Sequence, residues 1–267
     1  MTTAPPPAEG PDLAAQARRA RRFEAVLRTR MASEVRRLPF GTARLCPDLP
    51  LVYDASAVEV ERPVALVELL DPVEATFVDA GLGHRRITTS APEVAWTLVP
   101  ALSGAEGWDV SQVVYMVHDR TTRPAVSPVG FEVVDVDTWL DHADAFTAEH
   151  DWGRSAAVQA AMAERDRRLA DVVGTRFVLS RDGTAGCHVY RHGEVAQIEE
   201  VQVLSAARGQ GLGAGLMAAA MAACEDASLV FLVADADDWP RRWYTRLGFT
   251  PVASAWAWSR VADGSAS

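Results

Sequence analysis

The stretch Ile198–Ala214, IEEVQVLSAARGQGLGA, decides the fold of this 267-residue chain. Its first part, Ile198–Leu204, is rich in branched apolar residues and predicts a β-strand. A short connection leads to the glycine loop Arg208–Gly213, which opens into an Ala-, Leu- and Met-rich helix from about Gly213 to Ala223. Glycines permit a positive φ and a close approach to a ligand. Because the first N–H groups of a helix favour an anion, the loop predicts a phosphate site.

Two common phosphate-binding motifs were compared with this loop. A P-loop requires Lys and then Ser or Thr after its second glycine, and Leu212-Gly213 stands there, which excludes it. The dinucleotide fingerprint G-x-G-x-x-G/A is satisfied by Gly209, Gly211 and Ala214. In that fold, however, the glycines follow the strand almost directly, whereas residues 205–208 intervene here. A nicotinamide-dependent oxidoreductase therefore remains only an alternative.

A second motif, about thirty residues downstream, is not explained by dinucleotide binding: WYTRLGF at residues 243–249. Together the two stretches resemble the GNAT superfamily of acetyl-CoA-dependent N-acetyltransferases. The coenzyme A loop of that family, Q/R-x-x-G-x-G/A, is matched by Arg208, Gly211 and Gly213. Its Y-x-x-L-G-F helix end is matched by Tyr244, Leu247, Gly248 and Phe249. The resemblance covers about residues 131–261, roughly half of the chain.

Composition and charge limit the class of protein. The chain is 49% apolar with a net charge of −10, and it contains no apolar run long enough to cross a bilayer. The N-terminus lacks the pattern of a signal peptide, so a cytoplasmic protein without membrane contact is expected. Residues 131–267 hold 12 Arg and 20 acidic residues, which argues against nucleic acid as a partner. The same excess of acids fits either a cationic acceptor or a solvated surface.

The cysteines and histidines predict no metal site. Cys46, Cys187 and Cys224 are widely spaced and form neither a zinc pattern nor a disulfide framework, so we expect buried, inert thiols. His150, His188 and His192 are interpreted as ordinary surface or core residues.

The first half of the chain predicts a smaller α/β domain. Residues 1–11 are proline-rich and predict a disordered leader, and the domain spans residues 12–120. Apolar residues at helical spacing predict a helix over residues 12–38. The expected elements that follow are a strand at 51–60, a helix at 63–81 broken near Pro72, a strand at 84–88, a helix at 93–102 and a strand at 110–118. This order resembles a degenerate GNAT copy without a coenzyme loop, and an unrelated α/β cap is the alternative.

The second half predicts the complete catalytic unit, residues 131–261, after a linker at 121–130. The expected elements are a strand at 131–136, helices at 137–152 and 155–173, strands at 176–180, 184–191 and 194–204, a helix at 213–226, a strand at 229–234, a helix at 239–247 and a hairpin at 250–261. The overall fold class is therefore α/β (α+β), with a mixed central sheet in a GNAT-fold C-terminal domain.

The strand Ile198–Leu204 carries an irregularity. Strict alternation places Val201 and Val203 on one face, and Ile198 then has the wrong parity to share their core. One extra residue at Glu199-Glu200 restores the parity, and such β-bulges re-aim side chains beside active sites. We therefore predict a bulge at this pair of carboxylates.

The resemblance implies roles for individual residues. The first acid after the isoleucine of this strand often serves as general base in GNAT enzymes, which assigns that role to Glu199, with Glu200 as the alternate. The matching tyrosine, Tyr244, is the expected general acid for the coenzyme thiolate. Asp237 stands near the place where many relatives carry a coenzyme-binding Asn, and it accepts but does not donate a hydrogen bond. The remaining expected coenzyme contacts are Val201, Gln202 and Val203 on the strand, and Arg208, Gly209, Gln210, Gly211, Leu212, Gly213 and Ala214 in the loop.

The expected activity is transfer of an acetyl group from acetyl-CoA to a primary amine of a small molecule or a protein, by a monomer or homodimer. A free alkylamine is mostly protonated at neutral pH, so a carboxylate is needed to remove its proton. The first half of the chain is expected to cover the acceptor cleft. The main alternative is a non-catalytic module that binds acyl-CoA.

Overall fold

The computed structural model describes residues 12–103, 105–120, 122 and 126–261. The leader predicted at 1–11 and part of the linker predicted at 121–130 lie outside these described residues. Among the described residues, no helix combines the length and the apolarity needed to cross a membrane.

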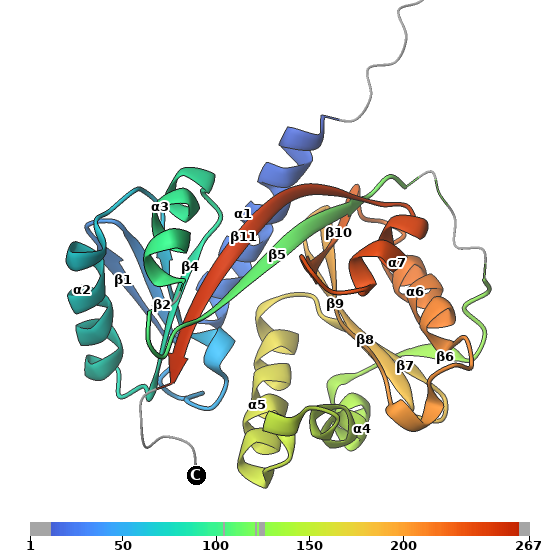
Figure 1. The fold of residues 1–267 in the computed structure, drawn as a ribbon. Helices are drawn as coiled ribbons and strands as arrows, with labels where there is room; N and C mark the ends of the chain where they lie inside the picture. Colours follow the sequence, from blue (N-terminus) through green and yellow to red (C-terminus); the bar gives the residue numbers. More distant parts are fainter. Residues whose placement is uncertain (1–11, 104, 121, 123–125, 262–267) are drawn as a thin grey trace, which may run out of the picture.

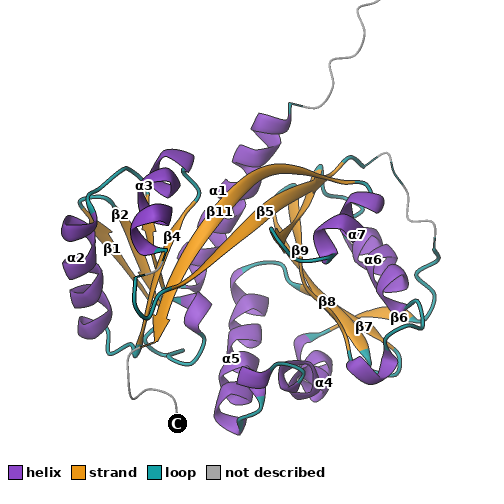
Figure 2. Ribbon diagram, viewed as in Figure 1, coloured by secondary structure: helices purple, strands orange, loops and turns teal. Residues whose placement is uncertain are grey.

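The elements follow one another as two groups along the chain (Figures 1 and 2). The first group is α1 (Leu13–Met31), β1 (Glu34–Leu38), β2 (Gly41–Leu45), the 3-10 turn η1 (Tyr53–Ala55), β3 (Ala57–Val60), α2 (Leu66–Asp79), β4 (His84–Thr89), α3 (Pro92–Leu102) and β5 (Asp109–His118). The second group is β6 (Phe131–Val134), α4 (Val136–Ala148), η2 (Asp151–Gly153), α5 (Ala156–Val172), β7 (Arg176–Ser180), β8 (Ala185–His192), β9 (Val195–Val203), η3 (Ser205–Ala207), α6 (Leu212–Ala223), β10 (Leu229–Asp235), α7 (Pro240–Arg246) and β11 (Phe249–Val261).

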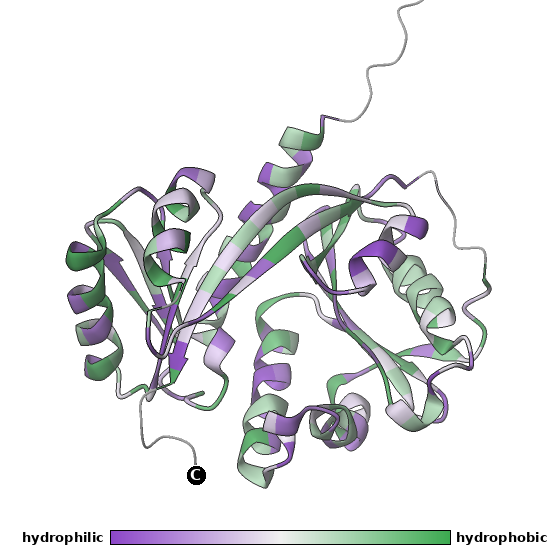
Figure 3. Cartoon of the chain, viewed as in Figure 1, coloured by the Kyte–Doolittle hydropathy of each residue, from purple (hydrophilic) through white to green (hydrophobic). Residues whose placement is uncertain are grey.

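The strands of the described residues form one mixed sheet in the order β1-β2-β3-β4-β11-β5-β10-β9-β8-β7-β6. Helices α2, α3, α6 and α7 pack on one face of this sheet, and α1, α4 and α5 pack on the other. Figure 3 shows α6 in apolar colours along most of its length, in keeping with the burial of Leu216, Met217 and Ala220 against the sheet. The predicted mixed α/β architecture is confirmed.

The helix predicted at 12–38 is too long. Helix α1 ends at Met31, and Val35 and Leu38 belong to β1, which pairs with β2 in a tight antiparallel hairpin. Gly41 starts β2 in a crowded position, because a Cβ there would lie 1.9 Å from the carbonyl oxygen of Glu59 on β3. Pairing across strands therefore overrides the local helical spacing.

The helix break predicted near Pro72 is also wrong. Helix α2 continues through Pro72 to Asp79. A proline removes one N–H from the helical ladder, and α2 tolerates this loss while Leu69, Val73 and Phe77 stay buried. The strand expected at 51–60 is shorter, since η1 precedes β3.

The hairpin predicted at 250–261 is a single strand of 13 residues, β11. It pairs with β5 from Phe249–His118 to Ser259–Asp109, and its second half also pairs with β4. Because its two partners come from the first half of the chain, no local pattern indicates them. The other elements predicted for residues 131–249 are confirmed, with shifted ends.

The two groups of elements repeat one topology. In the first, a meander β1-β2-β3 is followed by α2, by β4 parallel to β3, and by α3 and β5. In the second, β7-β8-β9 is followed by α6, by β10 parallel to β9, and by α7 and β11. Gly107 and Gly248, both with positive φ, lie just before β5 and β11. The two groups also exchange strands, since β11 lies between β4 and β5, and β5 lies between β10 and β11.

The exchange joins the hydrophobic cores. Trp258 of β11 is fully buried in the core of the first group, among Ile87, Leu98 and Leu102. Met116 of β5 is fully buried in the core formed by α6, β9 and β10. Each group therefore depends on a side chain from the other.

The prediction for the cysteines is confirmed. Cys46, Cys187 and Cys224 are buried and unpaired. Burial raises the pKa of the Cys224 thiol to about 12, so it is not ionised at neutral pH.

Substitution Trp258→Ala tests the exchange of strands. It removes a fully buried indole from the first core and should lower the free energy of unfolding by about 3–5 kcal/mol. The control Trp96→Ala removes a side chain that is 77% exposed and should change stability by less than about 0.5 kcal/mol. Urea denaturation followed by circular dichroism measures both variants. Equal stabilities would contradict the shared core.

Candidate functional site

Strand β9 contains the bulge predicted at Glu199-Glu200. Its register with β8 shifts between Gly186 and His188, and Glu200 has a φ of 53°, which is uncommon for a residue other than glycine. Ile198 before the bulge and Val201 after it contact the same core cluster. The bulge therefore corrects the parity of the strand, and the prediction is confirmed.

At the same point β9 separates from β10. The two parallel strands pair only from Val195–Leu229 to Ile198–Leu232. Beyond this point β9 continues to Val203 along β8, while β10 continues to Asp235 along β5. The facing edges of β9 and β10 thus diverge, and we call the space between them the wedge. Main-chain groups at 199–203 that face the wedge are open to an extended ligand.

The glycine loop forms the N-terminus of α6, which starts at Leu212, one residue earlier than predicted. Gly209 and Gly211 have φ of 79° and 80°, and a Cβ at either position meets no atom within 4 Å. Among the described residues, the N–H groups of 209–213 donate no backbone hydrogen bond. These donors and the helix dipole make the loop suited to an anion.

The side chain of Arg208 anchors the loop. Its Nε donates to the carbonyl oxygen of Val203 at 3.0 Å, and its Nη2 lies 3.1 Å from Glu149 Oε2 at the end of α4. Glu149 also accepts from the N–H and the hydroxyl of Ser205, and the hydrogen bond from this N–H lowers the pKa of Glu149. The guanidinium therefore holds the turn that precedes the glycines.

The two acids of the bulge differ in environment. Glu200 Oε1 lies 2.9 Å from Nη1 of Arg165, a side chain that is 10% exposed and that also donates to Asp166. Asp166 in turn accepts from Trp139 Nε1 at 2.8 Å. Burial acts to raise the pKa of Glu200, but the charge of Arg165 outweighs it and lowers this pKa. Glu200 is therefore ionised and fixed.

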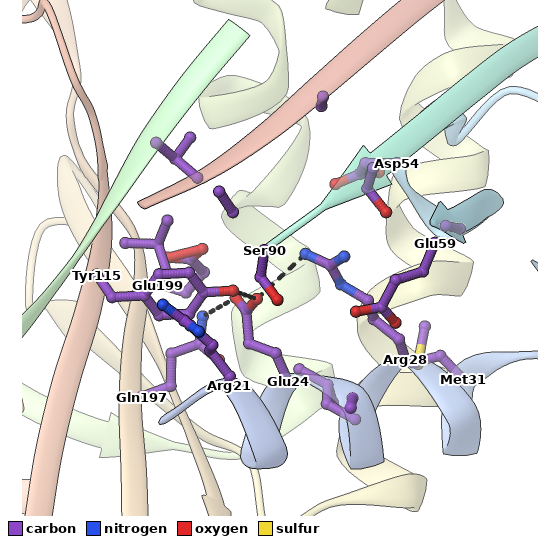
Figure 4. A pocket seen from close by; sticks show the side chains of 18 of the residues that line it. Arg21, Glu24, Arg28, Met31, Asp54, Glu59, Ser90, Tyr115, Gln197 and Glu199 are labelled. Carbon is purple, nitrogen blue, oxygen red and sulfur yellow. Dashed lines mark hydrogen bonds and ion pairs between the residues drawn. The ribbon is translucent and has the colours of Figure 1, made fainter. Parts of the chain in front are cut away.

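Glu199 faces a different environment. Burial raises its pKa well above the ordinary 4.5, and the charges of Glu24 and Glu200 raise it further. No ion pair or hydrogen bond of its side chain is found among the described residues. Figure 4 shows its carboxyl group turned toward Glu24 and Tyr115. A carboxyl group with a raised pKa is a good proton acceptor once it is ionised.

Glu199 lines a cavity of about 280 Å³ between α1 and the sheet. Its walls come from both groups of elements: α1, η1, β3, β4 and β5 from the first, and α5, β9, β10 and β11 from the second. Because β9 and β10 both contribute to it, the cavity adjoins the wedge (Figure 4).

Several polar residues of this cavity were missed by the sequence analysis. Glu24 on α1 accepts hydrogen bonds from Arg28 at 3.2 Å, from the hydroxyl of Tyr115 on β5, and from Gln197 Nε2 on β9 at 3.1 Å. One signal existed for Glu24, because an acid so close to the apolar stripe of a helix is unusual. Gln197 lies on the same face of β9 as Glu199, but the sequence did not indicate its hydrogen-bond partner.

Tyr244 lies on α7, 8% exposed, beside Trp243 and Phe249. Its hydroxyl has no hydrogen-bond partner among the described residues. Burial raises its pKa, and the charge of Glu199 raises it further, so the phenol is protonated at neutral pH. Asp237 is exposed on the connection from β10 to α7.

Substitution Arg165→Met tests the ion pair that holds the bulge. It leaves the buried carboxylate of Asp166 and the partly buried carboxylate of Glu200 without a counter-charge and should lower the free energy of unfolding by about 3–5 kcal/mol at pH 7. The lowered pKa of Glu200 means that its stabilising effect exists above the pKa of the unfolded chain and is lost as pH falls. The deficit should therefore shrink below about pH 4.

The control for this variant is Arg167→Met, on the same helix. Arg167 is 53% exposed and lies 3.7 Å from Glu164, so its loss should cost less than about 1 kcal/mol. Urea denaturation across pH compares the two variants, and a deficit of equal size at every pH would refute the electrostatic explanation.

Comparisons with known proteins agree with this geometry. The model of the acetyltransferase (GNAT) family matches residues 136–249, which include the bulge, the glycine loop and Tyr244. A search of curated proteins finds no match.

Solved structures show the same fold over most of the chain. A functionally unknown conserved protein from Staphylococcus epidermidis has a TM-score of 0.66 at 14% identity, covering 86% of this chain and 94% of its own. A GCN5-related N-acetyltransferase from Kribbella flavida has a TM-score of 0.60 at 20% identity, covering 95% of this chain and 96% of its own. A GCN5-related N-acetyltransferase-like protein from Streptococcus suis has a TM-score of 0.53 at 13% identity, covering 93% and 99%. Residues 136–249 of this chain therefore form a domain of the GNAT acetyltransferase family.

Proposed function

We propose that this protein transfers an acetyl group from acetyl-CoA to a primary amine. The observation that carries the proposal is the wedge, which opens after Ile198 and Leu232 with Glu199 at its edge. It offers an extended ligand unpaired main-chain groups and a carboxyl group with a raised pKa. The family of the domain supplies the chemistry of acyl transfer.

The coenzyme lies along the wedge. The open N–H groups of residues 209–213 bind its diphosphate, supported by the positive end of the α6 dipole. The main chain of residues 201–203 pairs with the pantetheine arm, and an N–H of the same strand stabilises the oxyanion that forms at the thioester carbonyl. Arg208 contributes by fixing the turn before the loop.

The reaction proceeds by direct attack. The amine nitrogen forms a bond to the thioester carbonyl carbon, the C–S bond breaks, and the thiolate of the coenzyme leaves. The proton of the amine passes to Glu199, directly or through one water, and Tyr244 protonates the thiolate. Tyr244 suits this role because its pKa is raised and its hydroxyl has no partner among the described residues.

The geometry favours Glu199 over Glu200 as the base. Glu200 has a lowered pKa and is engaged by Arg165, so it is a weak proton acceptor with a fixed position. Its role is to hold the bulge, which turns Glu199 toward the cavity.

We further propose that residues 12–120 form a degenerate copy that binds no coenzyme, and that residues 131–261 form the catalytic unit after a linker at 121–130. Helix α2 of the first copy begins at Leu66 after Ala65, without a glycine loop. The first copy serves the acceptor instead, because α1 covers the cavity and contributes Glu24. A cavity of about 280 Å³ between α1 and the sheet favours a small-molecule amine over a protein side chain.

Substitution Gly211→Val tests the coenzyme loop. A side chain at this position fills the space above the open N–H groups and requires a φ of 80°, so acetyl-CoA should lose its stabilising effect on the melting temperature. The control Gly193→Val imposes a comparable strain, with a φ of 57° in the turn between β8 and β9, away from the loop. Equal acetyl-CoA stabilisation of both variants would argue against the loop as the coenzyme site.

Substitution Glu199→Gln tests the base. It should lower kcat/KM by about 10²–10⁴ while leaving acetyl-CoA binding intact. In the unmodified protein, activity should rise with pH through the raised pKa of Glu199, because only the ionised carboxylate accepts a proton. This rise of activity with pH should be absent in Glu199→Gln.

The control for the base is Glu225→Gln, which changes an exposed acid at the end of α6. Thiol release over a pH series measures all three proteins. If activity rises with pH in Glu199→Gln as it does in the unmodified protein, Glu199 is not the base. Acetyl-CoA binding without thiol release from any amine would indicate a non-catalytic binding module.

A further inference from the structure

The floor of the cavity is one face of five adjacent strands, in the order β4-β11-β5-β10-β9. Alternate residues of each strand face the cavity, as the period of a strand requires. These alternating residues are Arg86 and Thr88 on β4, Ala255 and Ala257 on β11, Ser111, Val113 and Tyr115 on β5, Val233 on β10, and Gln197 and Glu199 on β9, and the cavity is also lined by Thr89, Trp256 and Glu200 of these strands. The middle of the floor is thus lined mostly by small or apolar side chains, and its two ends are polar.

The β9 end presents hydrogen-bond acceptors. Gln197 is 2% exposed and donates its Nε2 to Glu24, while its Oε1 is buried without a partner. Glu199 lies two residues further along the same face, and Glu24 reaches this end of the cavity from α1 (Figure 4). An unpaired buried acceptor is costly, so this end is built for a group that donates, such as an amine.

The β4 end presents donors from Arg86 and Thr88, and it also contains two acids, Asp54 and Glu59, of which Glu59 is paired with Arg44. Thr88 is 6% exposed, and its Oγ1 is buried without a partner. Arg86 lies two residues away on the same face and donates from Nη1 to Ser259 Oγ at 2.8 Å. Among the described residues, no carboxylate lies within ion-pair distance of Arg86, although the charge of exposed Asp54 acts on it. This end is suited to an anion that accepts from a guanidinium and a hydroxyl.

We propose that the acceptor is an ω-amino carboxylate, a molecule with a primary amine at one end and a carboxylate at the other, joined by an apolar chain. The proposal rests on the acetyl transfer proposed above and names its substrate class. The amine lies at Glu199 and Gln197, and the carboxylate lies at Arg86 and Thr88. Four strand spacings, or roughly 19 Å, separate the axes of β4 and β9 across the sheet. The two ends also differ in level along the strands, because Arg86 aligns through Ser259 with Asp109, whereas Ile198 aligns through Leu232 with Met116. The spacer therefore contains several carbon atoms.

Three further guanidinium groups line the cavity, of which Arg28 is paired with Glu24 and Arg165 with Asp166 and Glu200. The third, Arg21, defines the competing geometry. Arg21 on α1 has a buried Nε without a partner, and Figure 4 shows it on the Gln197 side of the cavity. A carboxylate held by Arg21 would lie close to the amine, as in an α-amino acid. The length of the spacer distinguishes this arrangement from the proposed one.

The experiment measures thiol release from acetyl-CoA with the full-length protein and a series of acceptors. The series is glycine, 4-aminobutanoate, 6-aminohexanoate and 8-aminooctanoate, each compared with the n-alkylamine of equal carbon number. We expect one of the longer acids to exceed its alkylamine about 10–100-fold in kcat/KM, through KM, since hydrogen bonds to a charged partner have that strength. A preference for alkylamines or glycine would overturn the proposal.

Two variants locate the carboxylate. In Arg86→Gln the ratio of kcat/KM for the acid to kcat/KM for its alkylamine should fall to about one. Arg86→Lys should retain part of the difference. Arg22→Gln, an exposed neighbour of Arg21, serves as the control and should keep the full advantage. Loss of the advantage in Arg21→Gln with full retention in Arg86→Gln would overturn the assignment.

A binding measurement separates this proposal from the proposed activity. In the absence of acetyl-CoA, at least one of the longer acids of the series should raise the melting temperature of the unmodified protein and not that of Arg86→Gln. If this difference in melting temperature is found but no acceptor causes thiol release, the carboxylate site is supported and only the proposed acetyl transfer is contradicted. An equal rise in both proteins, or none in either, would count against the carboxylate site.

Discussion

The antiparallel pairing of β5 with β11 is the interaction on which the rest of the structure depends. It runs from Phe249–His118 to Ser259–Asp109 and places each strand inside the sheet of the other half. Without it, the sheet would separate between β4 and β10, and both cores would lose a fully buried side chain, Trp258 or Met116. The floor of the cavity would also be divided, because its five strands belong to both halves.

Within this frame, a single extra residue in β9 gives two adjacent carboxylates opposite properties. Glu200, in the left-handed region, turns toward Arg165 and has a lowered pKa. Glu199 turns toward the cavity and has a raised pKa, through burial and the charge of Glu24 from α1. The second group of elements thus supplies this carboxyl group, and Glu24 of the first group contributes to its raised pKa. Elements of both groups form the walls of the cavity, and helix α2 of the first group begins without a glycine loop.

Local sequence predicted the parts of the site that lie on one stretch of chain. The bulge followed from the parity of Ile198 and Val201, and the loop followed from the glycines at 209 and 211, because each constraint acts between residues close in sequence. In two other segments the prediction from local sequence was wrong, because pairing with strands distant in the sequence decides the structure. Residues 34–38 carry helical spacing but form β1, and residues 250–261 contain turn-forming residues but form one strand between β4 and β5.

By itself, the sequence determined the order of elements in residues 131–249, the bulge, the glycine loop and the family of the domain, since these reside in short motifs of fixed spacing. Only the tertiary structure decided which acid of the pair is free and which is paired, because Arg165 approaches from another helix. It also decided the cavity, which is lined by Glu24 from α1, Arg86 from β4 and Gln197 from β9. Contacts between residues far apart in sequence arise from the packing of the whole sheet, and no single segment encodes them.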